Sequence, residues 1–367
     1  MTEPVSAPAL KHIFAPARFE LVAELLAQAA PEVDTEKFLA LSLDGLDALS
    51  LMERLRRMSD SLHIVLPDQY PQAIAILKRI VPDIKPGFVT LALCDVVGRY
   101  GLDHFTESLK ALKFFTPYGS AEFGIRPFLR QDLTRTLATM LKWAHDPDEH
   151  VRRLASEGCR PRLPWSFRLQ ALVDDPTPVL PILDALKSDP SLYVRKSVAN
   201  HFNDITKTHP EWVMTQMEAW PKDDAHSAWV ARHALRTLIK RGDKRALAII
   251  GVGARPKVRL DAFEVSPQQI DLGARMTLSA TMTSTARVSQ KMEIDYVVHY
   301  VKKSGAVSGK VFKLRALTLA AGERITLTRA QVMRDFSTRL HHPGRHAIDL
   351  MINGDVVASS HFDLVRP

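Results

Sequence analysis

Residues 151–165, with the sequence VRRLASEGCRPRLPW, place one carboxylate among four arginines and a tryptophan. Basic side chains suit phosphates, and an aromatic ring suits a base or a sugar. The carboxylate, Glu157, has the wrong charge for DNA unless it faces a cation. This mismatch makes the segment the first candidate for chemistry.

Helical spacing divides this segment into a packed face and an open face. Four residues lie at positions i, i+3, i+4 and i+7 and predict the packed face: Val151, Leu154, Ala155 and Gly158. We expect Arg152, Arg153 and Glu157 on or beside the open face. The alternative for Glu157 is a simple ion pair with Arg153, one helical turn earlier.

The helix is expected to end in a proline-rich turn, from Gly158 to Pro164. This turn carries Arg160 and Arg162 toward Trp165. Tryptophan is more often a core residue than a ligand contact, but its place beside Pro164 favours one open ring face.

A second group of polar residues, Asn200–Asp204, follows Lys196. The apolar residues around it form a packing stripe, which leaves Asp204 beside a polar row. Asp204 either lines a helix end or shares a cavity with Glu157. Glu122, in a Gly- and Pro-rich connection upstream, is a third candidate acid, although an acid in a loop usually faces solvent.

The sequence predicts helices separated by prolines over the first two thirds of the chain. Apolar residues recur at three- and four-residue spacing in five segments: 19–30, 46–58, 70–80, 89–100 and 101–115. Further along, an acidic turn precedes Val151, Val194 and Val230. Intervals of 43 and 36 residues are typical of HEAT-like helical repeats, which stack into a solenoid with a concave groove.

The pattern changes near Gly251. Seven alternating runs follow, and they predict an antiparallel sandwich of immunoglobulin-like form over residues 257–367. We therefore expect an all-α HEAT-like repeat solenoid over residues 1–253, then a small all-β immunoglobulin-like sandwich. Asn353-Gly354 predicts a two-residue hairpin turn.

Basic residues concentrate in the later part of the chain. Lys and Arg number 12 against 16 Asp and Glu in residues 1–125, but 20 against 15 in residues 126–245 and 16 against 10 in residues 257–367. A polyanion partner is the simplest interpretation. The alternative is a solvated basic surface.

Several classes of site lack support. There is no phosphate-binding loop, no HExxH and no CxxC, so we expect no cofactor and no metal. Adjacent His341 and His342 are interpreted as exposed loop histidines. The absence of a secretory or membrane segment, with only Cys94 and Cys159, favours the cytoplasm.

Three segments resemble the bacterial DNA alkylation repair proteins built from HEAT-like repeats. They are residues 151–165, DPSLYVRKSVANHFNDITKTHP from Asp189 and HALRTLIKRGD from His233. The strand-rich tail makes the AlkC branch, some of whose members carry an immunoglobulin-like domain, more similar than the AlkD branch. The resemblance covers roughly residues 10–250 of the helical part.

The resemblance implies a monofunctional DNA glycosylase in base excision repair, acting on cationic alkylated bases such as 3-methylcytosine and 3-methyladenine. It implies acidic site residues at Glu122, Glu157 and Asp204, and a lesion contact at Trp165. It also implies that the lesion can be reached without a deep base pocket. These acids would stabilise the oxocarbenium-like charge that develops on the sugar in the transition state.

The expected partner is double-stranded DNA with alkylated bases, bound by a monomeric, nucleoid-associated bacterial protein. Six basic residues are expected to contact phosphates: Arg152, Arg153, Arg160, Arg162, Arg195 and Lys196. The basic C-terminal domain is expected to clamp the duplex. The alternative function is a non-catalytic repeat scaffold that binds nucleic acid or protein.

Overall fold

The computed structural model describes residues 10–221, 223–253, 255–336 and 340–366. Its contacts divide the chain into two compact units, one ending at Thr208 and the other beginning at His209. Helical structure gives way to strands between Ile249 and Val258. The expected domain bounds, 1–253 and 257–367, stay a prediction.

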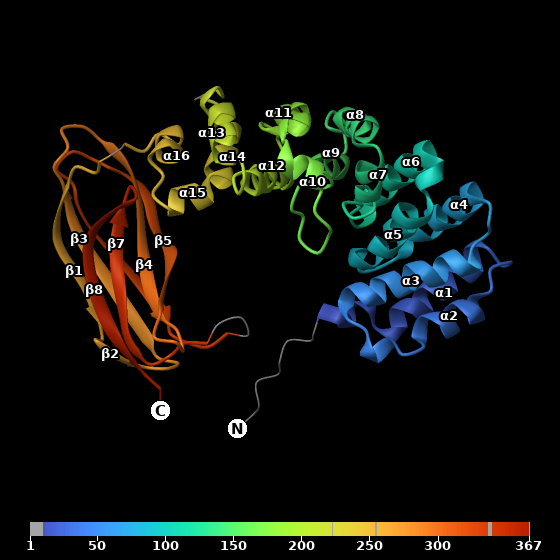
Figure 1. Cartoon of the computed structure of the whole chain (residues 1–367), viewed down its shortest axis with the longest axis horizontal. Helices are drawn as coiled ribbons and strands as arrows, with labels where there is room; N and C mark the ends of the chain where they lie inside the picture. The colour runs from blue at the N-terminus through green and yellow to red at the C-terminus, as the bar shows by residue number, and fades with distance from the viewer. Residues whose placement is uncertain (1–9, 222, 254, 337–339, 367) are drawn as a thin grey trace. The chain divides into compact units, whose positions relative to one another are not determined.

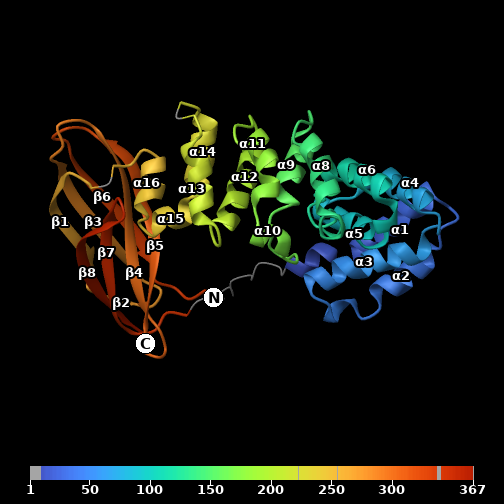
Figure 2. The ribbon, with the colours of Figure 1, turned by 45° about the horizontal axis from the view of Figure 1, so that its top comes forward.

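The first unit is helical throughout its described part. Contacts run from α1 to α4 to α6 in one layer and from α3 to α5 to α7 in the other, while α9 and α12 lie side by side (Figures 1 and 2). Its α-helices are α1 (Pro16–Ala29), α2 (Thr35–Leu43), α3 (Leu51–Val65), α4 (Tyr70–Ile80), α5 (Leu91–Tyr100), α6 (Phe105–Phe115), α7 (Arg126–Gln131), α8 (Leu133–Trp143), α9 (Glu149–Glu157), α10 (Gln170–Asp174), α11 (Leu180–Leu186) and α12 (Leu192–Ile205).

The predicted helices are present, with shifted ends. The segment expected from residue 101 begins its α-helix at Phe105, after a short 3-10 turn at Leu102–His104. Helix α2 was not expected; the side chain of Asp34 caps it by accepting from the backbone N–H of Lys37 at 2.9 Å. The fold class, a helical solenoid followed by a β-sandwich, is confirmed.

The repeat valines occupy matching places. Val151, Val194 and Val230 are buried on α9, α12 and, in the second unit, α14 (Ala225–Ala234). Asp148 of the first acidic turn caps α9 through its side chain, but α12 starts after Ser191, two residues beyond Asp189 of its own acidic turn. That aspartate, Asp189, instead pairs with Arg152 from the preceding repeat.

The second unit combines the last helices with two β-sheets. One sheet has the strand order β1-β3-β6 and the other β2-β8-β7-β4-β5. Its elements are α13 (Pro210–Glu218), α14 (Ala225–Ala234), α15 (Arg236–Lys240), α16 (Lys244–Ile249), β1 (Val258–Ser266), β2 (Gln269–Asp271), β3 (Arg275–Ser284), β4 (Gln290–Val301), β5 (Val307–Leu319), β6 (Arg324–Val332), β7 (Gly344–Ile352) and β8 (Asp355–Val365).

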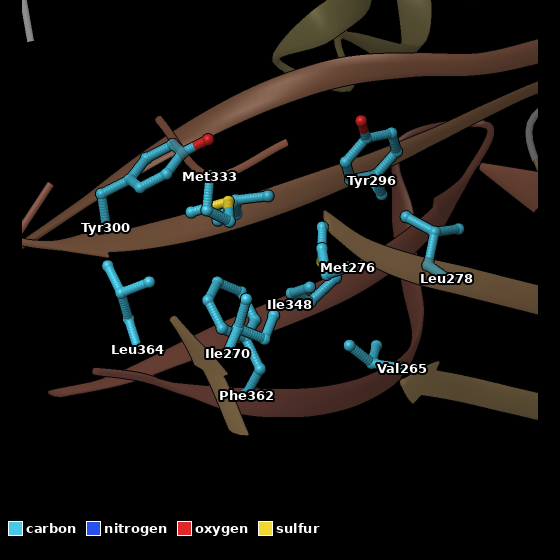
Figure 3. Packing of buried hydrophobic residues seen from close by; sticks show 11 residues of the cluster. Val265, Ile270, Met276, Leu278, Tyr296, Tyr300, Met333, Ile348, Phe362 and Leu364 are labelled. Carbon is cyan, nitrogen blue, oxygen red and sulfur yellow. The ribbon is translucent and has the colours of Figure 1, made fainter. Parts of the chain in front are cut away.

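All seven predicted strands form, and an eighth strand, β2, was not predicted. Strand β2 pairs with β8 in parallel, so the sandwich is not purely antiparallel. The sandwich core lies between the sheets, where Met276, Ile348 and Phe362 pack together (Figure 3). His341, expected to be exposed, is buried against the Tyr300 ring.

Charges and close backbone packing join the last helices to the sandwich. Arg232 of α14 forms an ion pair with Glu293, a buried residue on β4. Asn353 and Gly354 both have positive φ angles, as a two-residue hairpin turn requires. A Cβ added to Gly354 would overlap the backbone of Gly242, so the two segments touch through glycines.

We expect Gly354→Ala to destabilise this unit by about 2–5 kcal/mol, because it adds backbone strain to overpacking. Gly305→Ala is the matched control, since Gly305 also has a positive φ but faces open space. It should show the strain alone, about 1–2 kcal/mol. Thermal unfolding of both variants tests this, and equal melting temperatures would contradict the packing argument.

Candidate active site

Arg160 joins two of the three predicted acids. It lies in the turn after α9, and its Nη1 donates to Oε1 of Glu157 at 2.6 Å. Its Nε donates to Oδ2 of Asp204 on α12, and its Nη2 lies within reach of the same oxygen, both at 2.9 Å. All three side chains are buried. Glu157 and Asp204, 47 positions apart in the sequence, therefore share one ion-pair network.

Glu122 joins the same network through a second arginine. Nη1 of Arg153 donates to Oε2 of Glu122 and to the Ser120 hydroxyl, both at 2.9 Å. Nη2 of Arg153 lies 3.6 Å from Oε1 of Glu157. The expected pairing of Arg153 with Glu157 is thus present, as one link of a larger system rather than as an isolated surface pair.

Acids and cations alternate along this network. Lys207, half-exposed at the far end, donates to Oδ1 of Asp204 at 2.9 Å. A buried carboxylate is costly unless it is paired, so the alternation lets three acids lie in one region of the fold. We call this network the acidic row. In order, its members are Glu122, Arg153, Glu157, Arg160, Asp204 and Lys207.

A pocket of about 510 Å³ lies against one end of the acidic row. Glu122 and Glu157 line it, while Asp204 does not. Phe88 and Trp165 form part of its apolar wall. An apolar wall facing two carboxylates suits a flat, positively charged group.

Trp165 has an unusual backbone and an open ring. Its φ is 64°, a conformation that is rare for a bulky residue and concentrates at functional sites. The side chain is 59% exposed and meets the ring of Phe88 edge-on, with centroids 6.3 Å apart. The expectation of an open ring face is confirmed.

Four of the predicted phosphate-binding arginines are not on an open surface. Arg152 pairs with Asp189 at 2.7 Å, and Arg195 donates to the backbone oxygens of Asp189 and Pro190. Arg152, like Arg153 and Arg160, binds an acid from a different segment of the fold, whereas Arg195 binds the turn before its own helix. Helical spacing alone could not show the first three contacts, because those acids lie outside the helix that carries the arginine or precedes it. Lys196 is exposed, so it can contact a phosphate directly, and Arg162 is half-buried.

Three residues near the acids were missed by the sequence reasoning. The Ser197 hydroxyl donates to Oε2 of Glu157 at 2.7 Å, and the Tyr193 ring lies 5.0 Å from the Arg153 guanidinium. Arg126, on α7, is buried beneath the turn that carries Trp165. No local pattern marks them, since each acts on a segment at least 32 positions away.

Burial changes two titratable groups near the row. It raises the pKa of Glu122, and the neighbouring Glu157 adds to this, whereas Arg153 opposes it. Burial also lowers the pKa of His201 to about 3. Its ring is therefore neutral at physiological pH, and its Nδ1–H donates to the Ser156 carbonyl at 3.0 Å.

Within the described ranges, no group of three or more His, Cys, Asp or Glu side chains is arranged to hold a metal ion. None of the helices described is long and apolar enough to cross a membrane.

We expect Arg160→Gln to destabilise the first unit by about 3–5 kcal/mol, because it leaves two buried carboxylates short of a partner. Lys196→Gln, an exposed change on α12, should alter stability by less than about 0.5 kcal/mol. Thermal unfolding compares the two variants. An Arg160→Gln protein as stable as the wild type would show that the acids do not depend on this arginine.

The two parts of the chain match two described families. Residues 116–238 match the family described as DNA alkylation repair enzyme. Residues 259–366 match the C-terminal immunoglobulin-like domain of the uncharacterised protein YhaZ.

Two similar proteins match over nearly the whole chain. Pseudomonas fluorescens alkylpurine DNA glycosylase AlkC, solved bound to DNA containing an abasic site analog, is 50% identical with a TM-score of 0.94, covering 98% of this chain and 100% of that one. Uncharacterized protein YhaZ of Bacillus subtilis (strain 168) is 41% identical over 349 residues, covering 94% of this chain and 97% of that protein. This chain therefore belongs to the AlkC branch of the DNA alkylation repair glycosylases, with helical repeats followed by an immunoglobulin-like domain.

Proposed function

We propose that this chain hydrolyses the N-glycosidic bond of cationic N-alkylated bases in duplex DNA, with 3-methylcytosine and 3-methyladenine as substrates. The observation that supports this best is the acidic row beside a pocket with an exposed tryptophan. A base alkylated at a ring nitrogen is positively charged and already a good leaving group. Carboxylates that face this charge distinguish it from a neutral base.

Each acid has a separate role in this proposal. Glu157, at the pocket, faces the cationic nucleotide, and Glu122 adds negative potential. Both stabilise the oxocarbenium-like sugar that forms as the base leaves. Trp165 contacts the lesion or its sugar. No lysine nucleophile is required, so we expect no lyase step.

Asp204 is proposed to orient or deprotonate the attacking water. Arg160 holds its Oδ2, and Lys207 holds its Oδ1. The Lys207 side chain is half-exposed, so it can turn toward solvent or a phosphate and leave Oδ1 free for water. A carboxylate held on one side keeps its orientation while it accepts a proton on the other.

DNA binding is proposed to use two kinds of basic residue. Lys196 and Arg162 contact phosphates directly, while the half-buried Arg152 and Arg153 and the buried Arg160 and Arg195 act by holding the acids and the turns between the helices. The basic immunoglobulin-like domain adds phosphate contacts. The protein is proposed to act as a monomer.

The test uses duplexes that carry one 3-methylcytosine or 3-methyladenine. After incubation with the protein, hot alkali should cut the strand at the abasic product. Glu157→Gln and Asp204→Asn should slow single-turnover excision by about 100-fold or more while DNA binding is kept. Lys196→Gln, the control, should weaken binding and its salt dependence instead.

Two results would contradict this proposal. The first is no strand break above background with any cationic base. The second is excision that survives both acid substitutions, because the acids would then have no catalytic role. Binding without excision would favour the non-catalytic repeat scaffold.

The raised pKa of Glu122 predicts a pH dependence. In this proposal the ionised form of Glu122 is the active one. The excision rate should therefore be highest above the pKa of Glu122 and should fall as the pH is lowered through it. Glu122→Gln should be slower at neutral pH and should lack this acid limb. Single-turnover rates between about pH 5 and 8 provide the measurement. The same limb in both proteins would assign the titration to another group.

A further inference from the structure

Arg126 is completely buried, and within the described part of the chain its guanidinium donates hydrogen bonds to backbone carbonyl oxygens. Its Nη1 donates to the carbonyl oxygens of Gly158 at 2.9 Å and Arg160 at 2.7 Å. Its Nη2 donates to the carbonyl of Phe167. An arginine fork that binds three carbonyls of one segment is a costly arrangement to bury, so it calls for an explanation.

The three carbonyls belong to the two ends of one turn. The site turn, residues 158–167, leaves α9 at Gly158 and comes back at Phe167. Between these ends it carries Arg160, which bridges the acids, and Trp165, with its positive φ. The same guanidinium lies 5.3 Å from the Phe167 ring centroid. Arg126 therefore closes the turn at its base.

The close approach of α7 and α9 makes this contact possible. A Cβ added to Gly158 would overlap the Ile125 side chain, so only glycine lets the end of α9 come so near to the start of α7. Burial lowers the pKa of Arg126 to about 10, which still leaves it charged at physiological pH. Its fixed positive charge and planar fork then hold both ends of the turn.

We propose that Arg126 is a positioning residue that holds Trp165 in its strained conformation at the pocket. The proposal rests on the proposed glycosylase function, and Arg126 touches neither the base nor the sugar. A turn held at both ends can keep a backbone conformation that would otherwise relax, as strained residues at functional sites require. Misplacing a substrate contact by about 1 Å costs on the order of 100-fold in rate.

The test is a double-mutant cycle between Arg126→Met and Trp165→Phe. Arg126→Met should slow single-turnover excision of 3-methylcytosine by about 100-fold while DNA affinity is kept. In a Trp165→Phe protein, the same change should slow excision no further, because the residue it positions is gone. Effects that multiply would overturn the proposal.

Two further variants separate positioning from folding. Arg126→Lys keeps the buried charge but cannot bind all three carbonyls in one plane, so its rate should lie between wild type and Arg126→Met. If Arg126→Met does not fold, the cycle is run with Arg126→Lys. Arg130→Met is the control: Arg130 stacks on the Phe167 ring at 4.6 Å, and no described bond links it to the turn carbonyls. It should excise at the wild-type rate.

A readout independent of activity keeps this inference separate from the function itself. The emission of Trp165 is obtained by subtracting the spectrum of each Trp165→Phe protein from that of its parent. Arg126→Met should change this difference spectrum and its quenching by acrylamide, whether or not the protein excises a base. An unchanged spectrum would overturn the proposal. Absence of excision by the wild type would overturn only the proposed function.

Discussion

The ion pair that Arg160 makes with both Glu157 and Asp204 is the interaction on which the site depends. Three carboxylates cannot be buried close together unless cations separate them, because desolvation and mutual repulsion oppose their charged forms. The alternation from Glu122 to Lys207 satisfies this requirement. It also ties α9, α12 and the loop before α7 to one another, so the three acids and the repeat packing rest on the same contacts.

The alternation explains why the arginines look like DNA ligands in the sequence but not in the structure. A site that selects a cationic base needs negative potential, while its surroundings must attract a polyanion. In this chain the inner arginines compensate the acids, and the exposed Lys196 remains available to phosphate. The negative potential of the site and the attraction for a polyanion are separated by how deeply the basic side chains lie, not by their residue type. A count of basic residues cannot separate them.

Much of the fold could be predicted because local sequence patterns indicate its helices and strands. Helical spacing located α4 and the packed face of α9, and alternation located the strands of the sandwich. The errors lie where no local pattern exists. Helix α2 is capped by the side chain of one aspartate, and the three-residue β2 is held by its pairing with the edge of β8. Helix α12 starts after Ser191, and Asp189 pairs with Arg152 instead of capping the helix.

The sequence by itself determined the residue types, the repeat interval and the family resemblance, and from these it predicted the acids, the tryptophan and their chemistry. Only the tertiary structure decided that Arg160 joins Glu157 to Asp204, that Arg152 pairs with Asp189, and that Arg126 closes the turn of Trp165. The physical reason is the distance along the chain between a charged residue and its partner. Spacing along one helix shows which residues share a face, but the cost of a buried charge is met by a partner on another helix.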